Sequence, residues 1–244
     1  MINHTTPHRE RPSEIRGMFN AIAPTYDLLN RLLSFGLDVR WRRRAIALFE
    51  KQREGVFLDI AAGSGDVSLD LLTLQPTHVV GVDFAQRMLE VFQEKLARRG
   101  AQNTIDLACC DALALPFAND TFDGTIVAFG IRNFSDRSQS LQEMYRVLRS
   151  NGLSIILELS EPRISVVRWL YQLYARIGLP LFGKLISRHT SAYRYLPASI
   201  AGFPREEEFI EMMRAAGFED VKALPLTFGA VMIYVGRKPP VTRA

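Results

Sequence analysis

The stretch from Val56 to Asp66 limits the folds open to this chain more than any other part of its sequence. It reads Val-Phe-Leu-Asp-Ile-Ala-Ala-Gly-Ser-Gly-Asp, an apolar run with strand propensity that stops at small residues and is followed by a helical spacing of apolar residues. Gly63 and Gly65 permit a tight turn and a close approach of a ligand to bare backbone, and free amides at a helix N-terminus attract polar groups. The pattern predicts a strand, a turn and a helix around a nucleotide-like ligand.

An acidic residue that follows about twenty positions later narrows the choice of ligand. Asp83 closes the next apolar run, which begins at His78, and a carboxylate there can accept hydrogen bonds from both ribose hydroxyls. A dinucleotide fingerprint would have a third glycine three residues after Gly65, where this chain has Ser68. The loop therefore favours a nucleoside ligand without a pyrophosphate. A glycine turn without any ligand and a nicotinamide oxidoreductase are the alternatives.

The composition is that of an ordinary globular protein, with 244 residues, 48% hydrophobic and 23% charged. A net charge of +4 is compatible with an anionic membrane surface or with solubility alone, and it does not indicate nucleic-acid binding. Cys109 and Cys110 are adjacent, so they form neither a disulfide framework nor a zinc site, and we expect both in a buried strand. No leader pattern or membrane-spanning run stands out. These features predict a cytoplasmic protein, with peripheral attachment to the inner face of the membrane as an option, and no bound metal.

Strand-like and helix-like segments alternate through the rest of the chain. The predicted strands after the glycine loop are residues 78–83, 104–109, 122–129, 153–159, 221–226 and 228–235, and the predicted helices are residues 85–99, 138–149 and 205–216. A turn is expected at Ser150-Asn151-Gly152. Because alternating strands and helices build parallel sheets, the pattern predicts an α/β fold: a Rossmann-like, seven-stranded, mostly parallel sheet with helices on both faces.

Two helical additions are expected around this sheet. Residues 15–50 carry apolar side chains near helical spacing, interrupted by Pro24 and Gly36, which predicts two or three short helices. Residues 162–187 are unusually apolar and predict two helices inserted after the fifth strand, as a lid over a site or as plain core packing. We therefore expect a single domain with an N-terminal helical cap (1–50), a cofactor-binding core (51–160), an apolar insertion (161–204) and a closing helix with a strand hairpin (205–244).

Polar residues follow two of the later predicted strands, at the end where ligands of open α/β sheets bind. Asp111 and Ala112 come directly after one strand, and the carboxylate of Asp111 could accept from an adenine amino group or simply cap its loop. Arg132 and Asn133 follow the strand 122–129 and lie between apolar neighbours. Their placement favours a substrate or cofactor contact.

Several motifs resemble one family of enzymes. The pattern Asp59-x-x-x-Gly63-x-Gly65 resembles the first motif of the S-adenosylmethionine-dependent methyltransferases. Other stretches, from roughly residue 15 to 238, resemble the ubiquinone/menaquinone-biosynthesis C-methyltransferases. These are Tyr26-Asp27-Leu28-Leu29-Asn30, Leu33-Ser34-Phe35-Gly36 with Trp41, Phe129-Gly130-Ile131-Arg132-Asn133, Arg146-Val147-Leu148-Arg149-x-x-Gly152 with Glu158-x-Ser160, and Ser191-Ala192-Tyr193-Arg194-Tyr195-Leu196-Pro197.

The resemblance implies that the chain uses S-adenosyl-L-methionine to methylate a ring carbon of a polyprenylated quinol, with demethylmenaquinol to menaquinol as the first choice. A benzoquinol of the ubiquinone pathway, another small apolar aromatic acceptor, and a lipid-binding relative without turnover are the alternatives. Contact of the apolar insertion with an anionic membrane is expected, and whether the chain forms a homodimer is left open. Asp38 stands where the family usually has histidine, so no histidine acts at that position.

Carried over by position, the resemblance assigns roles to individual residues. The residues expected to bind the cofactor are Asp59, Gly63, Ser64, Gly65, Asp83, Asp111, Ala112 and Ala128, the last of which is often serine in the family. Arg132 is the leading catalytic candidate, either stabilising a phenolate or polarising a water, with a loop-ordering ion pair as the alternative. Tyr26 and Asn133 are further catalytic candidates, and Asp27 and Tyr195 are expected to contact the quinol.

Overall fold

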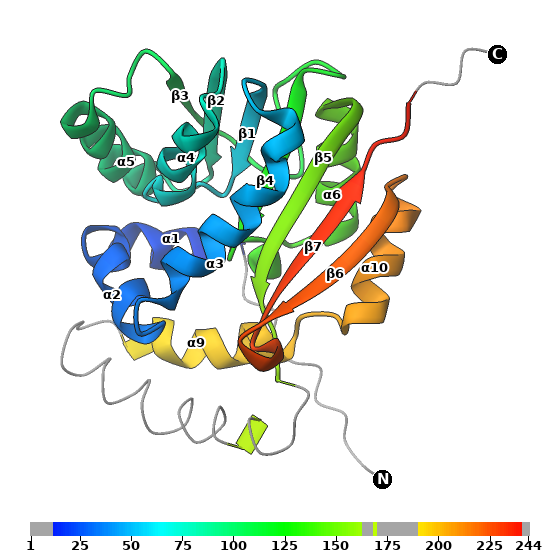
Figure 1. The fold of residues 1–244 in the computed structure, drawn as a ribbon. Helices are drawn as coiled ribbons and strands as arrows, with labels where there is room; N and C mark the ends of the chain where they lie inside the picture. Colours follow the sequence, from blue (N-terminus) through cyan, green and yellow to red (C-terminus); the bar gives the residue numbers. More distant parts are fainter. Residues whose placement is uncertain (1–11, 163–167, 170–189, 241–244) are drawn as a thin grey trace, which may run out of the picture.

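A computed structural model describes residues 12–162, 168–169 and 190–240, which form one twisted sheet covered by helices (Figure 1). The seven strands have the order β3-β2-β1-β4-β5-β7-β6. Strands β1 to β5 are parallel, and β7 lies antiparallel between β5 and β6. Their bounds are β1 (Val56–Ile60), β2 (His78–Asp83), β3 (Ile105–Cys109), β4 (Phe122–Ala128), β5 (Leu148–Leu159), β6 (Glu219–Leu226) and β7 (Val231–Arg237). The predicted fold class is confirmed.

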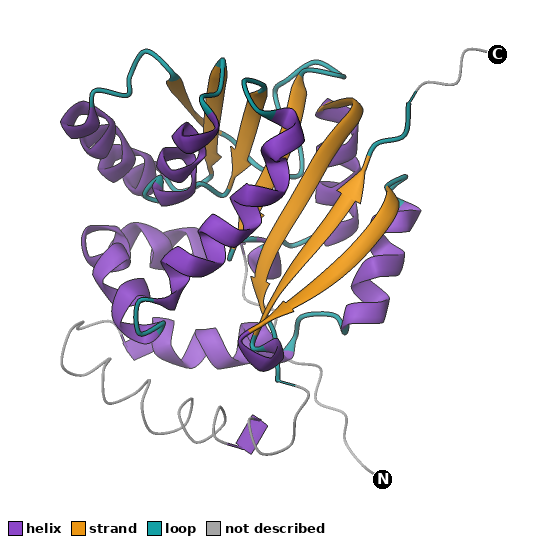
Figure 2. Cartoon of the chain, in the orientation of Figure 1, coloured by secondary structure: helices purple, strands orange, loops and turns teal. Residues whose placement is uncertain are grey.

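Helices cover both faces of the sheet (Figure 2). The α-helices are α1 (Pro12–Ile22), α2 (Tyr26–Leu33), α3 (Leu37–Ile46), α4 (Asp66–Leu71), α5 (Gln86–Arg99), α6 (Arg137–Val147), α9 (Thr190–Ala201) and α10 (Glu206–Ala215). Short 3-10 turns connect several of them, among them η4 (Ile131–Asn133) and η6 (Thr227–Gly229). Helices α3, α4 and α5 contribute to the core on one face, and α6 and α10 to the core on the other.

The central strands carry apolar side chains on both faces. In β5, Ile155 and Leu157 pack into the core beneath α3 and α4, whereas Ile156 between them packs beneath α6. All three are fully buried. Successive side chains of a strand point to opposite faces, so a strand covered on both sides needs a nearly continuous apolar sequence. This requirement explains why the central strands of this chain read as nearly continuous apolar runs.

A helical cap lies across the carboxyl ends of the parallel strands, formed by α1, α2, the start of α3 and α9 (Figure 1). The two or three short helices expected in residues 15–50 are present as α1, α2 and α3. Most of the predicted insertion, including its two expected helices, lies outside the described residues. In the part of the chain that the structure describes, no helix is long and apolar enough to span a bilayer.

Strand β5 begins earlier than the sequence predicts. The expected turn at residues 150–152 forms a bulge within β5: Leu148 pairs with Phe122 and Leu153 with Gly124, so four residues of β5 stand opposite one of β4. The bulge stays attached to the sheet because the Asn151 amide donates to the carbonyl of Lys238 (2.9 Å) and the Lys238 amide to that of Gly152 (3.1 Å). Asn151 takes a left-handed φ of 65°, which asparagine tolerates well. The predicted strand start at Leu153 is therefore wrong.

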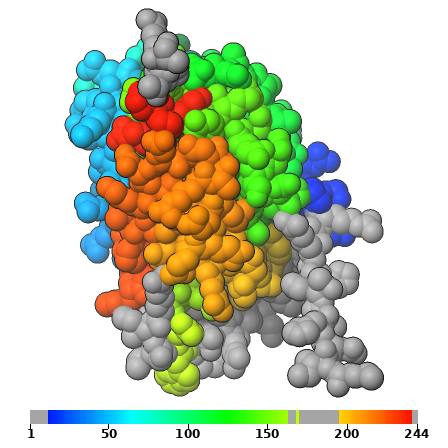
Figure 3. All heavy atoms as spheres, turned by 90° about the vertical axis from the view of Figure 1, so that its right-hand side faces the viewer, coloured from blue at the N-terminus to red at the C-terminus, as the bar shows by residue number. Residues whose placement is uncertain are grey.

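The two edges of the sheet differ in how they are covered. Cys109 ends the edge strand β3 and is exposed, and Cys110 is partly buried, so the expectation of two buried cysteines is wrong. An edge strand has a neighbouring strand on one side only, so its side chains have fewer neighbours to cover them than those of a central strand. At the opposite edge, β6 and α10 form the middle of the face drawn in Figure 3, in orange.

Candidate active site

The glycine loop connects β1 to α4 through a sharp turn in left-handed backbone. Gly63 has a φ of 56° and Gly65 a φ of 88°. A Cβ atom at Gly65 would lie 2.0 Å from the ring of Phe92 on α5, so the start of α4 approaches α5 more closely than any side chain would allow. Ala61 also takes a left-handed φ, of 56°, which strains a residue that carries a Cβ. The loop therefore exposes bare backbone at the end of β1.

Asp83, at the end of β2, holds this loop from the neighbouring strand. Its Oδ2 accepts a hydrogen bond from the amide of Gly63 (2.9 Å), and its Oδ1 accepts one from the amide of Ala85 (2.8 Å). The carboxylate is only 7% exposed. Burial raises the pKa of Asp83 above its ordinary value, although the two amides oppose the rise. The predicted neighbourhood of Gly63 and Asp83 is present in the structure, because both line one cleft.

This cleft has a volume of about 70 Å³ and lies where the strand order reverses, between β1 and β4. Ligands of open α/β sheets bind at that point. Five of the predicted cofactor residues line it: Gly63, Asp83, Asp111, Ala112 and Ala128. Asp111 is exposed, and its Oδ1 accepts a hydrogen bond from the amide of Leu113 (2.9 Å). None of the described residues that line the cleft is lysine or arginine, which disfavours a phosphate ligand.

The other three predicted cofactor residues, two in the loop and one in β1, do not line the cleft. Ser64 is buried and donates a hydrogen bond to Asp27, while Gly65 is the N-cap of α4. Asp59 is 1% exposed, and its Oδ2 accepts from the hydroxyl of Ser68 (2.6 Å). Its Oδ1 finds no hydrogen-bond partner among the described residues. Burial raises the pKa of Asp59 to about 7. These residues stabilise the shape of the glycine loop. Direct contact of any of them with a cofactor stays a prediction.

A second and larger space, an apolar cavity of about 300 Å³, lies beside the cleft. Its wall comes from the helical cap and from β7, and includes Ile22, Leu29, Leu33, Trp41, Leu196 and Ile200. Phe19, Tyr26 and Phe129 line both spaces, so the cleft and the cavity meet at these aromatic side chains. The indole of Trp41 donates to the hydroxyl of Thr227 (2.8 Å) and thereby joins α3 to η6.

Arg132 lies at the wall of the apolar cavity with a buried counter-ion. Its Nη1 is 2.7 Å from Oε1 of Glu158, and its amide donates to Oε2 of the same residue (3.1 Å). Glu158 is fully buried. Burial would lower the pKa of Arg132, but the charge of Glu158 raises it above its ordinary value. The ion pair that was the alternative to a catalytic role is thus present, and the buried Nε finds no hydrogen-bond partner among the described residues.

Of the remaining predicted residues, Tyr26 lines both spaces, Asn133 lines the cleft and Tyr195 lines the apolar cavity. Burial raises the pKa of Tyr26, and the hydrogen bond with Asn30 only partly offsets this, so its hydroxyl stays protonated. The hydroxyl of Tyr195 donates to Oδ1 of Asn133 (2.8 Å) and joins α9 to η4. Asp27 lines neither space, because its carboxylate contacts Ser64 and Lys95. Its expected contact with a quinol therefore has no support from its position.

The sequence alone did not single out Glu158 or Arg42 as candidates. Glu158 is a charged residue inside an apolar strand, and such a residue needs a partner, which was the available signal. Arg42 is 8% exposed within a run of three arginines, where only its spacing of four residues from Asp38 indicates a helical ion pair.

The cleft suits S-adenosyl-L-methionine. Asp83 offers a carboxylate for ribose hydroxyls, the glycine loop offers backbone to an uncharged part of the ligand, and the alanines at 112 and 128 leave a flat apolar wall. Together, the sheet topology and this cleft define a class I S-adenosylmethionine-dependent methyltransferase.

Comparisons with solved structures agree with this fold. A solved S-adenosylmethionine-dependent methyltransferase from Aquifex aeolicus superposes with a TM-score of 0.61 at 14% identity, covering 94% of this chain and 99% of its own. The [4+2]-cyclase SpnF superposes with a TM-score of 0.66 at 16% identity, covering 95% and 98%.

Relatives with similar sequences identify the family of this chain. The ubiquinone/menaquinone biosynthesis C-methyltransferase UbiE of Geotalea uraniireducens is 44% identical over 94% of this chain and 98% of its own. The demethylmenaquinone methyltransferase of Thermus thermophilus is 46% identical over 91% of this chain and 100% of its own. The model of the ubiE/COQ5 methyltransferase family matches residues 6–238. This chain belongs to that family, as the resemblance of its motifs implied, and its cofactor is S-adenosyl-L-methionine.

Proposed function

We propose that the protein methylates a ring carbon of a polyprenylated quinol and converts demethylmenaquinol to menaquinol. The observation that carries this proposal is the apolar cavity of about 300 Å³ that meets the cofactor cleft at Tyr26 and Phe129. An apolar space next to the methyl donor suits a quinol ring and the first part of its prenyl tail. Relatives in Thermus thermophilus and Bacteroides fragilis that are named demethylmenaquinone methyltransferase, at 46% and 40% identity, support the same substrate.

In this proposal, the cofactor supplies an activated methyl group, and the chain positions the acceptor and manages its charge. A ring carbon of a hydroquinone becomes nucleophilic when a hydroxyl gives its proton to a water, and the carbon that gains the methyl group then releases its own hydrogen as a second proton. Arg132 stabilises the resulting phenolate, because Glu158 fixes its positively charged guanidinium at the cavity wall. Tyr26 keeps its proton and orients the acceptor at the junction of the two spaces. Asn133 and Tyr195 hold η4 and α9 together on the acceptor side.

Cofactor binding is assigned in the same way. Gly63, Asp83, Asp111, Ala112 and Ala128 contact the cofactor from the wall of the cleft. The shape of the glycine loop is stabilised by Asp59, Ser64 and Gly65.

The proposal includes contact with an anionic membrane from the cytoplasmic side. Large apolar side chains are exposed on α2, on the turn after it and on η6, with Phe35 at 72% and Phe228 at 70% exposure. Phe35 also lines the apolar cavity, so a lipid-tailed quinol could pass from a bilayer into the cavity along this side chain. A Phe35→Ser, Phe228→Ser variant should float with anionic liposomes at low salt less than the wild type does. Equal flotation would contradict the contact, and a dimer lost in the variant would identify the patch as a subunit interface.

The enzymatic proposal is tested in a bacterial host that lacks this methyltransferase. Quinones extracted with and without the gene are compared by mass spectrometry, and an Asp83→Asn variant, which should bind the cofactor less tightly, serves as a weakened control. We expect the demethylmenaquinone of the host to gain one methyl group. A methyl gain on the benzoquinone alone would redirect the proposal to the ubiquinone pathway, and no gain with soluble protein present would refute it.

A further inference from the structure

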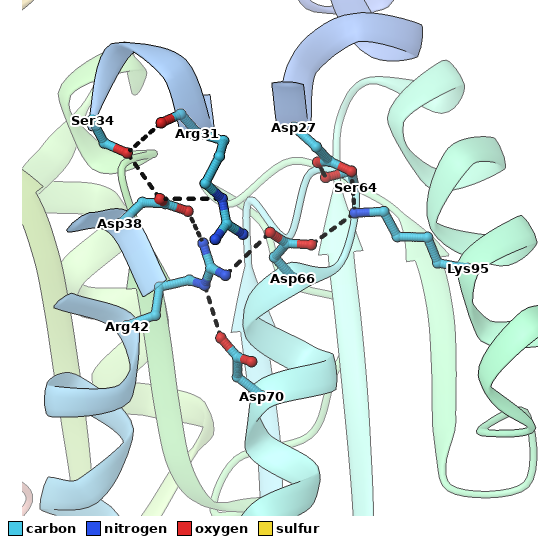
Figure 4. A network of polar contacts seen from close by, with 9 residues as sticks. All are labelled: Asp27, Arg31, Ser34, Asp38, Arg42, Ser64, Asp66, Asp70 and Lys95. Atoms are coloured by element: carbon cyan, nitrogen blue, oxygen red, sulfur yellow. Dashed lines mark hydrogen bonds and ion pairs between the residues drawn. The ribbon is translucent and has the colours of Figure 1, made fainter. Parts of the chain in front are cut away.

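A cluster of charged side chains connects the helical cap to the glycine loop (Figure 4). At its centre is Arg42 of α3, whose three guanidinium nitrogens each meet a different carboxylate. Nη1 lies 2.7 Å from Oδ2 of Asp38, Nη2 lies 3.2 Å from Oδ2 of Asp66, and Nε lies 2.8 Å from Oδ2 of Asp70. The side chains of Arg42 and Asp38 are 9% and 6% exposed. One buried guanidinium thus fastens α3 to α4.

The cluster continues from Asp66 to the glycine loop. Lys95 of α5 lies 2.8 Å from Oδ1 of Asp66 and also contacts Asp27 of α2. Asp27 in turn accepts a hydrogen bond from Ser64 in the glycine loop. A continuous path of polar contacts therefore leads from the cap, through Arg42 and Asp66, to Lys95, Asp27 and the cofactor loop (Figure 4).

Arg42 also links the wall of the apolar cavity to the start of α4. Together with Asp38, it lines the apolar cavity, where the acceptor is proposed to bind. Asp66, a second of its three partners, is the first residue of α4 and follows Gly65 directly. A displacement of the cavity wall at α3 must therefore move Asp66 or break one of the charged contacts of Arg42.

Neighbouring groups favour the charged forms of Asp66 and Arg42. Burial would raise the pKa of Asp66, but Lys95 and Arg42 hold it below its ordinary value. Burial would lower the pKa of Arg42, and its carboxylate partners, Asp70 first, raise it instead. A planar guanidinium can satisfy several carboxylates at fixed angles, which the single ammonium of lysine cannot do. Loss of one partner from a buried charged group is costly, so the cap and the loop resist moving independently.

We propose that Arg42 is a positioning residue that couples occupancy of the apolar cavity to cofactor binding at the glycine loop. Filling the cavity sets the position of α3, and Arg42 transmits that position through Asp66 to the backbone that holds the cofactor. The nature of the cavity ligand rests on the function proposed above.

The coupling is measured by calorimetry with unreactive ligands. S-adenosylhomocysteine is titrated into the full-length protein with and without saturating demethylmenaquinone, the oxidised form that accepts no methyl group, in the same detergent. For the wild type we expect the quinone to tighten S-adenosylhomocysteine binding by about fivefold or more, the range typical of coupled sites. In Arg42→Lys, the same ratio should fall to about one, because the lysine cannot hold Asp38, Asp66 and Asp70 together.

Two further variants separate coupling from general damage. Arg44→Met changes an exposed arginine on the same helix and should keep the wild-type ratio. Asp70→Asn keeps Arg42 but weakens one of its anchors, so it should lower the ratio even where Arg42→Lys does not fold. A purely structural role would lower the melting temperature without changing the ratio.

A wild-type ratio near one, or an unchanged ratio in Arg42→Lys or Asp70→Asn, would overturn the coupling. Because the readout is binding, this outcome differs from a failure of the proposed function, in which demethylmenaquinol is not methylated.

Discussion

Replacement of Asp59 by asparagine should change how the stability of this protein depends on pH. Asp59 is buried beneath the glycine loop, and its pKa is raised from an ordinary 3.8 to about 7. The folded protein therefore holds a proton that the unfolded chain releases from about pH 4 upward. Its stabilising effect is complete below the unfolded pKa and is lost as the pH rises through the folded pKa. At about 1.4 kcal/mol per pKa unit, the loss amounts to at most about 4 kcal/mol between pH 4 and pH 7.

Asparagine resembles the protonated aspartic acid in shape and carries no charge, so Asp59→Asn should remove this pH dependence. We expect the free energy of unfolding of the variant, relative to that of the wild type, to rise by about 2 to 4 kcal/mol from pH 4.5 to pH 8. Urea unfolding followed by circular dichroism across this range measures it. Glu208→Gln, at an exposed position of α10, is the matched control and should show no such trend. A constant difference between Asp59→Asn and the wild type would refute the assignment of a raised pKa to Asp59.

Three substitutions test the site more directly. Asp83→Asn should weaken S-adenosylhomocysteine binding by about tenfold or more, since hydrogen bonds to a charged group are worth about 1.5–3 kcal/mol, and calorimetry with unchanged affinity would contradict its role. Arg132→Ala should lower kcat by about a hundredfold or more while leaving cofactor affinity near that of the wild type. Full turnover of this variant in steady-state assays would mean that Arg132 only orders its loop through an ion pair. Gly65→Ala should destabilise the fold by at least about 1–3 kcal/mol, because its Cβ would meet Phe92 at 2.0 Å and its φ is 88°, and a melting temperature equal to that of the wild type would contradict this.

Much of the fold was predictable because its signals are local. Buried strands covered on both faces give short apolar runs, and the glycine loop marks where the first strand ends. The chain between Asp83 and Leu148 follows this pattern closely. The start of β5 was mispredicted because the bonds that keep residues 149–152 in the sheet come from Lys238, far away in sequence. Cys109 was placed wrongly because a strand sequence does not reveal that β3 is an edge.

The cofactor cleft was more predictable than the acceptor side. Gly63 lies in the loop directly after β1 and Asp83 ends β2, and neighbouring parallel strands bring their carboxyl ends together. The partner of Arg132 depends on the pairing of β4 with β5, which places Glu158 beside η4 although the two residues are 26 positions apart. Arg42 lies among exposed arginines, and only the rotation of α3 on the sheet decides which of them is buried. Such pairings follow from tertiary structure and leave little trace in a single sequence.

The central claim is that one protein holds a methyl donor between the glycine loop and Asp83 and delivers the methyl group into the adjoining apolar cavity. The most direct test incubates the purified protein with reduced demethylmenaquinone and S-adenosylmethionine that carries a deuterated methyl group, without air, and measures the mass of the recovered quinone. The account predicts a menaquinone whose ring carries the labelled methyl group. Recovery of unlabelled demethylmenaquinone, from protein that binds the donor in the same sample, would contradict it.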